Sequence, residues 1–130
     1  MSEALGGHEQ YGIVALSNVD DYGANRIKKH ELTTLDKEED RTRLCDVQGA
    51  NAGPVFLAFQ GAEEIQVKIQ EWIMGEPYGH VVSDDGFSHT LWKIPVEDSL
   101  ELSKAFEDIE CTYVADGHHR TAAAYNVGEL

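Results

Sequence analysis

The sequence predicts a mixed α/β domain in which helices flank a small mixed sheet. Short apolar runs of strand length alternate with segments that have apolar residues at helical spacing, which is typical of this class. A strong hairpin signal lies in the middle of the chain, and a strand-like run near the C-terminus leads directly into a helix-like run. The 130 residues, 42% of them apolar, are enough to build one core. We expect residues 1–10 to be a flexible tail and residues 11–130 to form a single domain.

The strands are predicted from runs of apolar, branched and aromatic side chains. We expect the first run to be buried on both faces because it contains almost no polar residue. The hairpin is expected because Asp84-Asp85-Gly86 separates two strand-like arms. The predicted strands are Tyr11–Leu16, Pro54–Phe59, the hairpin arms His80–Val82 and Ser88–Pro95, and Cys111–Ala115.

The helices are predicted from apolar periodicity and from end signals. Two acidic pairs, Asp36 with Glu39 and Asp98 with Glu101, have the spacing of capping boxes at helix starts. Asp20–Gly23 indicates a turn, and Arg26–Glu31 is a basic segment of undetermined form. The predicted helices run from Asp36 to about Gly49, from Ala62 to Met74, from Asp98 to Ile109, and from Thr121 onward. The last helix reaches Leu130 without a clear cap, which indicates a chain taken from a longer protein.

The charge balance limits the classes of partner. With 24 acidic and 10 basic residues the net charge is −14, which disfavours phosphate-mediated binding to DNA or RNA and binding to anionic membranes. No signal peptide or membrane-spanning run is recognisable, and we expect a cytoplasmic protein. The two cysteines, Cys45 and Cys111, are expected to be reduced and to lie in the core. The oligomeric state is not indicated.

The most informative motif is Asp116-Gly117-His118-His119-Arg120-Thr121, at the junction between the last strand and the last helix. A helix start leaves backbone N–H groups without intrahelical partners, and the helix dipole is positive there. Basic side chains are unfavourable at that end unless an anion binds, so this motif predicts a site for a small anionic ligand, most plausibly a phosphate or nucleotide. Two alternatives remain open: Asp116 caps the helix, or Asp116, His118 and His119 bind a metal ion.

A second charged cluster, Lys28-Lys29-His30-Glu31, precedes the helix that contains Arg41. A solvated surface loop is the simpler interpretation of such a charge run. Alternatively, a carboxylate flanked by cations acts as a base toward a hydroxyl group. The sequence does not show whether Glu31 lies near Arg120.

A set of short motifs is spread over most of the chain: Ile27-Lys-Lys-His-Glu31-x-Thr33, Lys37-x-x-Asp40-Arg41, Gly49-Ala-Asn51, Pro54-Val-Phe-Leu, Leu91-Trp92 and Ala115-Asp-Gly-His-His-Arg120. Together they resemble the family known as domain of unknown function 1015, over about Tyr11 to Tyr125. Members of that family are considerably longer, so the chain resembles its central portion. The family is in turn distantly similar to the ParB/sulfiredoxin-like superfamily, which implies that fold for this chain.

The free-serine kinases of that superfamily provide the nearest chemical parallel. The resemblance implies that Glu31 is the base toward a small hydroxy amino acid such as serine, and that His30 contacts phosphate or substrate. It implies that the Gly117–Arg120 turn, with Asp116 and Thr121 beside it, holds the phosphates of ATP or ADP with Mg²⁺. Sulfiredoxin chemistry is not expected, because histidines stand where sulfiredoxins have a cysteine. The alternatives are a non-catalytic phosphate or nucleotide sensor or assembly domain and, less favoured, a ParB-like DNA-associated protein.

Overall fold

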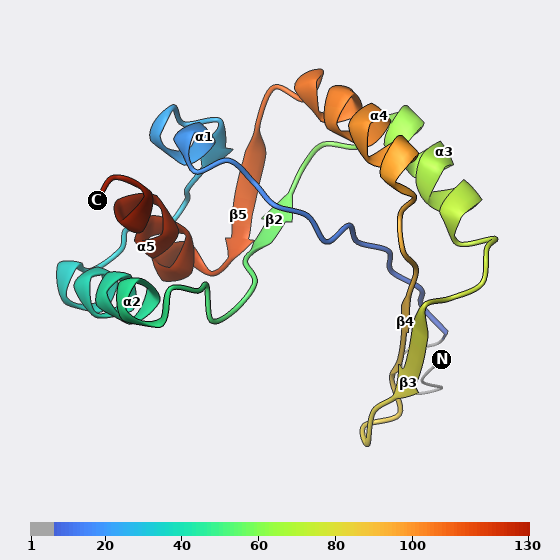
Figure 1. Cartoon of the computed structure of the whole chain (residues 1–130), viewed down its shortest axis with the longest axis horizontal. Helices are drawn as coiled ribbons and strands as arrows, with labels where there is room; N and C mark the ends of the chain where they lie inside the picture. The colour runs from blue at the N-terminus through green and yellow to red at the C-terminus, as the bar shows by residue number, and fades with distance from the viewer. Residues whose placement is uncertain (1–6) are drawn as a thin grey trace. The chain divides into compact units, whose positions relative to one another are not determined.

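The structure is a computed structural model that describes residues 7–130, so the first six residues of the expected tail lie outside the described part. Within that part the chain is mixed α/β, with five helices and five strands (Figure 1). It forms two compact units: the described residues up to Ala15 with Gly61–Asp108, and Leu16–Gln60 with Ile109–Leu130. We call these unit 1 and unit 2. The expectation of one domain over residues 11–130 remains a prediction.

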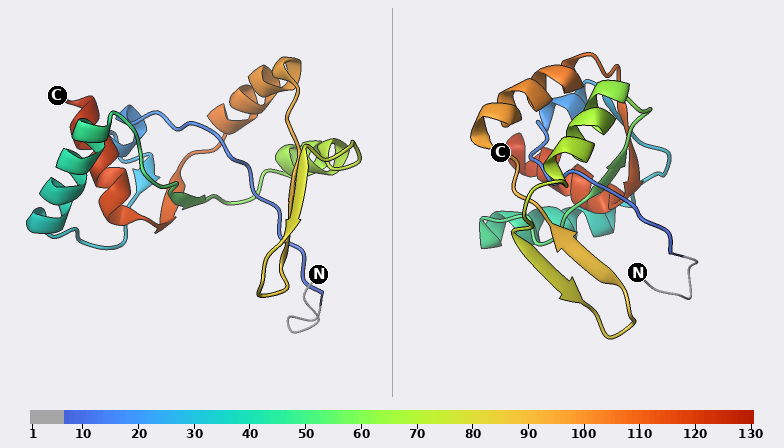
Figure 2. Two further views of the ribbon diagram at one scale, coloured as in Figure 1. Left: turned by 60° about the horizontal axis from the view of Figure 1, so that its bottom comes forward. Right: turned by 90° about the vertical axis from the view of Figure 1, so that its right-hand side faces the viewer.

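Unit 2 contains a three-stranded sheet with the order β1-β5-β2. Strand β1 runs parallel to β5, and β2 runs antiparallel to it. Helix α5 follows β5 and contacts it, and α2 packs against α5 (Figures 1 and 2). The core is formed by Tyr22, Ile27, Val114 and Ala122. The elements of unit 2 are α1 (Asp20–Gly23), β1 (Ile27–Lys28), α2 (Leu35–Gln48), β2 (Phe56–Ala58), β5 (Thr112–Asp116) and α5 (His118–Gly128).

The strand directions bring three loops to one edge of this sheet. In the parallel pair Ile27 lies opposite Thr112, so the residues after β1 and the residues after β5 leave the sheet at the same edge. The antiparallel strand β2 begins at that edge, where Phe56 lies opposite Asp116. A register irregularity between Phe56 and Leu57 interrupts the ladder there, as β-bulges often do near functional sites. The loops after β1, before β2 and after β5 therefore meet at the carboxyl end of the central strand.

Unit 1 combines a helix pair with the expected hairpin. Helix α3 (Glu63–Trp72) and helix α4 (Val96–Glu107) provide the buried side chains Ile65 and Leu102. Strands β3 (Gly79–Val82) and β4 (Ser88–Leu91) pair antiparallel, which confirms the hairpin prediction. No helix in the described part of the chain is both long and apolar enough to cross a membrane.

The prediction of a buried strand at Tyr11–Leu16 is wrong. This segment has no regular secondary structure, and Val14 and Leu16 are 87% and 102% exposed. An apolar run becomes a buried strand only where a neighbouring strand satisfies its backbone groups. Within residues 7–130 no strand pairs with this segment.

Both predicted capping boxes are also wrong. Helix α2 begins one residue earlier than expected and α4 begins two residues earlier, and neither has a side-chain cap. The acidic groups of α4 make tertiary contacts instead: Asp98 accepts a hydrogen bond from the Trp72 indole at 2.7 Å, and Glu101 pairs with Lys68 at 2.6 Å. The end of α2 is as predicted, because Gly49 adopts the left-handed conformation that terminates helices.

The remaining local expectations are resolved by the structure. The turn at Asp20–Gly23 is a single helical turn, and the segment after Arg26 provides the short strand β1. Cys45 and Cys111 are both free thiols, but each is only half-buried, so the expectation that they lie in the core is wrong.

Candidate anion-binding site

The site is built around Gly117, the residue between β5 and α5. Its φ of +93° lies in the left-handed region that favours glycine. A Cβ atom here would lie 3.1 Å from Val55 Cγ1 and 2.9 Å from an Arg120 guanidinium nitrogen. The chain therefore requires glycine both for the backbone conformation and for the close approach of its neighbours.

The acidic residue before the glycine does not cap the helix. Gly117 itself occupies the N-cap position, and no side chain makes a capping hydrogen bond to α5. Asp116 instead accepts a hydrogen bond from the Arg120 guanidinium at 2.8 Å, and both side chains are largely exposed. An exposed ion pair of this kind contributes at most about 1 kcal/mol, so a stronger anionic ligand can compete for the guanidinium.

The first turn of α5 carries His118, His119 and Arg120 and no acidic residue. The other helices in residues 7–130 all have acidic side chains in their first turn, which complements the positive end of the helix dipole. In α5 the backbone N–H groups lack a side-chain acceptor and basic groups surround them. A bound anion would compensate for both features.

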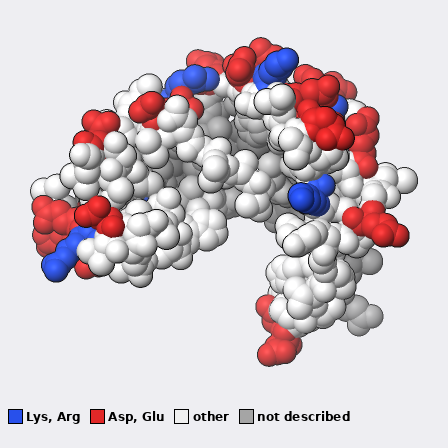
Figure 3. Space-filling model, in the orientation of Figure 1, with Lys and Arg blue, Asp and Glu red and all other residues white. Residues whose placement is uncertain are grey.

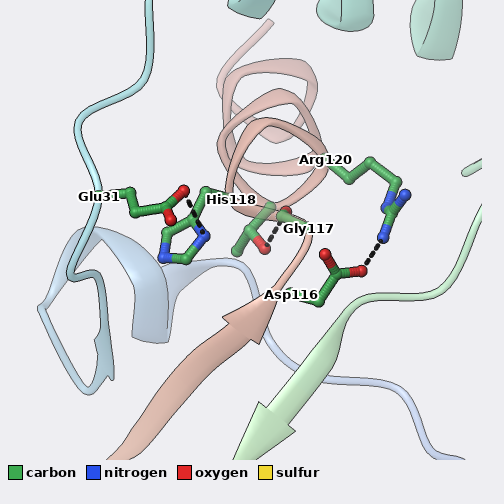
Figure 4. A network of polar contacts seen from close by, with 6 residues as sticks. Glu31, Asp116, Gly117, His118 and Arg120 are labelled. Carbon is green, nitrogen blue, oxygen red and sulfur yellow. Dashed lines mark hydrogen bonds and ion pairs between the residues drawn. The ribbon is translucent and has the colours of Figure 1, made fainter.

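The structure brings the second predicted cluster to the same place. His30 and Glu31 follow β1, and β1 is parallel to β5, so they lie beside the first residue of α5. One carboxylate oxygen of Glu31 is 3.6 Å from His118 Nδ1, and the His30 ring meets the His118 ring edge-on with centroids 4.5 Å apart. Figure 4 shows the Glu31–His118 pair on one side of the helix start and the Asp116–Arg120 pair on the other.

A hollow of about 330 Å³ joins these groups, a size at the lower end of small-ligand pockets. Six of the eight predicted site residues line the hollow. His30 does not line it, but its ring contacts the ring of His118, which does. Arg41 also lines the hollow; it was not predicted as a site residue, although the helix that contains it follows the charged cluster at Lys28–Glu31. The lining residues are Glu31, Arg41, Ala115, Asp116, Gly117, His118, His119 and Arg120.

Thr121, which was also predicted to belong to the site, does not line the hollow. Its side chain is buried, and its hydroxyl donates a hydrogen bond to the Gly117 carbonyl at 2.9 Å. The backbone N–H of Thr121 donates to the same carbonyl. These two hydrogen bonds from Thr121 to the Gly117 carbonyl stabilise the turn.

Helix α2, which provides Arg41, is held beside α5 by a partly buried carboxylate. Glu38 accepts hydrogen bonds from Thr33 at 2.6 Å and from Asn126 at 2.8 Å. These two hydrogen bonds lower the pKa of Glu38, and the positive charges of Lys29 and His119 contribute less. Glu38 is therefore a charged link between the helix that carries the turn and the helix that carries Arg41.

Two buried ring nitrogens at the site have no hydrogen-bond partner, His118 Nε2 and His119 Nδ1. Among residues 7–130, a group able to offer three ligand atoms to a metal is His30, Glu31 and His118, whose ligand atoms all lie within 4.8 Å of one another. The combination of Asp116, His118 and His119 that the sequence left open does not converge in this way in the described chain.

The site contrasts with the rest of the surface. Figure 3 shows acidic groups at many points of the visible face and Lys or Arg at few, as expected for a net charge of −14. Around the hollow, by contrast, the guanidinium groups of Arg41 and Arg120 balance the carboxylates of Glu31 and Asp116, and two histidines lie beside them. The hollow therefore lacks the acidic excess of the molecule as a whole, and a small anion meets less repulsion there.

Comparison with known proteins assigns the chain to a family whose function is unknown. No curated protein and no solved structure matches the chain. The family model described as "Protein of unknown function (DUF1015)" matches residues 1–130, somewhat more than the Tyr11–Tyr125 span of the sequence resemblance. The chain therefore belongs to the DUF1015 family of proteins of unknown function.

Proposed function

We propose that unit 2 binds the phosphates of ATP or ADP with Mg²⁺ at the Gly117–Arg120 turn and transfers a phosphoryl group to a small hydroxy compound such as serine. The observation that carries the proposal is the shared hollow: Glu31, from a loop more than 80 residues earlier in the chain, lines it together with the turn. The distant sequence resemblance to ParB/sulfiredoxin-like proteins, free-serine kinases among them, supports the same assignment of roles.

Each group has a role in this reaction. The backbone N–H groups of the turn and the Arg120 guanidinium bind phosphate oxygens, and Arg41 adds positive charge from α2. Glu31 accepts the proton of the substrate hydroxyl. At the same time the hydroxyl oxygen attacks the γ-phosphorus of ATP, and the bond between that phosphorus and the ADP oxygen breaks. The products are ADP and the phosphorylated hydroxy compound.

His30 and His118 position Glu31 in this scheme. His118 is almost fully buried and lies against the Glu31 carboxylate, while His30 contacts the His118 ring. Mg²⁺ bound to a nucleotide neutralises charge on its phosphates and keeps several water ligands. Asp116, at the rim of the hollow, is the carboxylate that fits such a hydrated ion.

Isothermal titration of the chain with ADP, ATP and inorganic phosphate, with Mg²⁺ present, tests binding. Arg120→Ala should weaken nucleotide binding by about 10- to 100-fold, the loss of a charge-assisted hydrogen bond of about 1.5–3 kcal/mol. Arg43→Ala is the matched control, because Arg43 is exposed on α2 and does not line the hollow. Equal binding by both variants would contradict the proposal.

Phosphoryl transfer to serine, followed by ADP release in a coupled assay, tests the reaction. Glu31→Gln should keep nucleotide binding and lose turnover, whereas Glu39→Gln, on the exposed face of α2, should change neither. Binding without any product in the unaltered chain would instead identify a phosphate or nucleotide sensor. Salt-dependent retention on DNA would identify the ParB-like alternative.

A further inference from the structure

We infer that His30, Glu31 and His118 form a binding site for a transition-metal ion of the zinc type. This site goes beyond the proposed phosphoryl transfer and does not depend on it. The three ligand atoms come from two segments of unit 2, the loop after β1 and the first residue of α5, and all lie within 4.8 Å of one another.

The donor set selects the kind of metal. Two imidazoles and one carboxylate suit borderline ions such as Zn²⁺ or Fe²⁺, whereas Mg²⁺ and Ca²⁺ prefer oxygen ligands alone. Three protein ligands of this type leave a coordination position open for water or a ligand, as in catalytic zinc sites. His30 and Glu31 are exposed, so the site is accessible from solvent.

The geometry is close to that of a bound ion. Zinc–ligand distances of about 2.0–2.2 Å place neighbouring ligand atoms of a tetrahedral site about 3.3 Å apart. Glu31 and His118 are already 3.6 Å apart at their nearest oxygen and nitrogen. Since His30 and Glu31 are on an exposed loop, small side-chain rotations are sufficient to close the remaining distance.

The His118 ring provides the second, independent observation. Its side chain is only 7% exposed, and its Nε2 atom is buried without a hydrogen-bond partner. Its Nδ1 atom has the 3.6 Å contact with Glu31, which is too long for a hydrogen bond. Neither ring nitrogen of this buried imidazole therefore makes a hydrogen bond, and coordination of Nδ1, the nitrogen nearest Glu31, to a metal would satisfy one of the two.

Metal binding has a consequence for Glu31. A carboxylate that coordinates Zn²⁺ is a weaker base toward a substrate hydroxyl, because the metal and the proton compete for it. If the chain is a phosphotransferase, added Zn²⁺ should therefore inhibit it at concentrations that fill this site. The inference of a metal site does not depend on that activity.

The test is a competition titration of the full chain, freed of metal with a chelator, against a chromophoric zinc indicator. We expect one tight zinc site per chain, with binding at least about tenfold weaker in His30→Ala and in Glu31→Gln, since loss of even an outer hydrogen-bond partner of a zinc site costs 10- to 100-fold. Both altered residues are exposed, so folding should be preserved. Visible absorption of the Co²⁺-loaded chain should show the bands of a four- or five-coordinate site and lose them in both variants.

Two controls separate this site from other zinc-binding groups and from the nucleotide site. The double variant His80→Ala/His89→Ala removes the hairpin histidines of unit 1 and should leave the tight site unchanged. Arg120→Ala should also bind zinc normally, even where it loses nucleotide. Absence of tight binding, or equal binding in His30→Ala and the unaltered chain, would overturn the inference whether or not nucleotide binds.

Discussion

Replacement of Gly117 by alanine tests the geometry on which the anion site depends. A non-glycine residue in the left-handed region costs about 1–2 kcal/mol, and Gly117 has a φ of +93°. The added Cβ would also lie 3.1 Å from Val55 Cγ1, a contact that the segment before β2 must relieve. The Arg120 guanidinium, 2.9 Å from the same Cβ, would have to move as well. We expect Gly117→Ala to lower the free energy of unfolding by about 2–3 kcal/mol and to weaken phosphate binding.

Gly49→Ala is the matched control for this substitution. Gly49 also has a left-handed φ, +60°, but nothing lies within 4 Å of the position of its Cβ. It therefore reports the backbone strain alone, about 1 kcal/mol. Urea denaturation measures both variants, and phosphate titration measures binding. If Gly117→Ala is no less stable than Gly49→Ala and binds phosphate normally, the argument for a tightly packed turn is refuted.

Two further predictions concern the contacts that hold the helices together. The pKa of Glu38 is lowered by hydrogen bonds from Thr33 and Asn126, so its contribution to stability should be full above the ordinary glutamate pKa and be lost as the pH falls through the lowered value. Glu38→Gln should accordingly cost about 1 kcal/mol at pH 7, with the difference from the unaltered chain shrinking in urea denaturation below about pH 4. In unit 1, Trp72→Phe keeps an aromatic side chain but removes the indole N–H and its 2.7 Å hydrogen bond to Asp98, and thermal unfolding should show a loss of at least about 1 kcal/mol.

Each of these two substitutions has a control in which the same type of residue is replaced in the same way in a more exposed environment. Glu39→Gln removes an exposed carboxylate from the same helix and should have little effect at either pH. Trp92→Phe removes a longer and more exposed indole hydrogen bond, 3.2 Å to the Gly75 carbonyl. A loss in Trp92→Phe as large as that in Trp72→Phe would contradict the importance given to the α3–α4 contact.

The sequence predicts the elements of this chain better than their partners. The hairpin and the junction at Gly117 were expected because turn chemistry is local. The burial of Tyr11–Leu16 was wrongly predicted because burial requires a neighbour that local pattern does not reveal. The capping boxes failed for a related reason: Asp98 binds Trp72, 26 residues away, and local spacing does not report such a partner.

The candidate site shows the same difference between what local sequence predicts and what depends on distant partners. The half that we propose to bind an anion is a continuous stretch, Asp116–Arg120. Its basic side chains are unfavourable at the positive end of a helix dipole, so this half is recognisable in the sequence. Its other half, Glu31 with His30, is joined to the first by a parallel pairing of only two residues, Ile27–Lys28, too short to predict from periodicity.

The direction of that short strand decides which chemistry is available at the turn. With β1 parallel to β5, Glu31 and the α5 start leave the sheet at the same edge, and a Glu31 carboxylate oxygen lies 3.6 Å from His118 Nδ1. An antiparallel β1 would carry His30 and Glu31 to the opposite edge, more than one strand length from Arg120. The turn would then have neither the proposed base nor the proposed metal ligands beside it. The pairing of Ile27 with Thr112 is therefore the contact that brings the proposed base to the proposed anion site, and Lys28→Pro should weaken that pairing and separate the two.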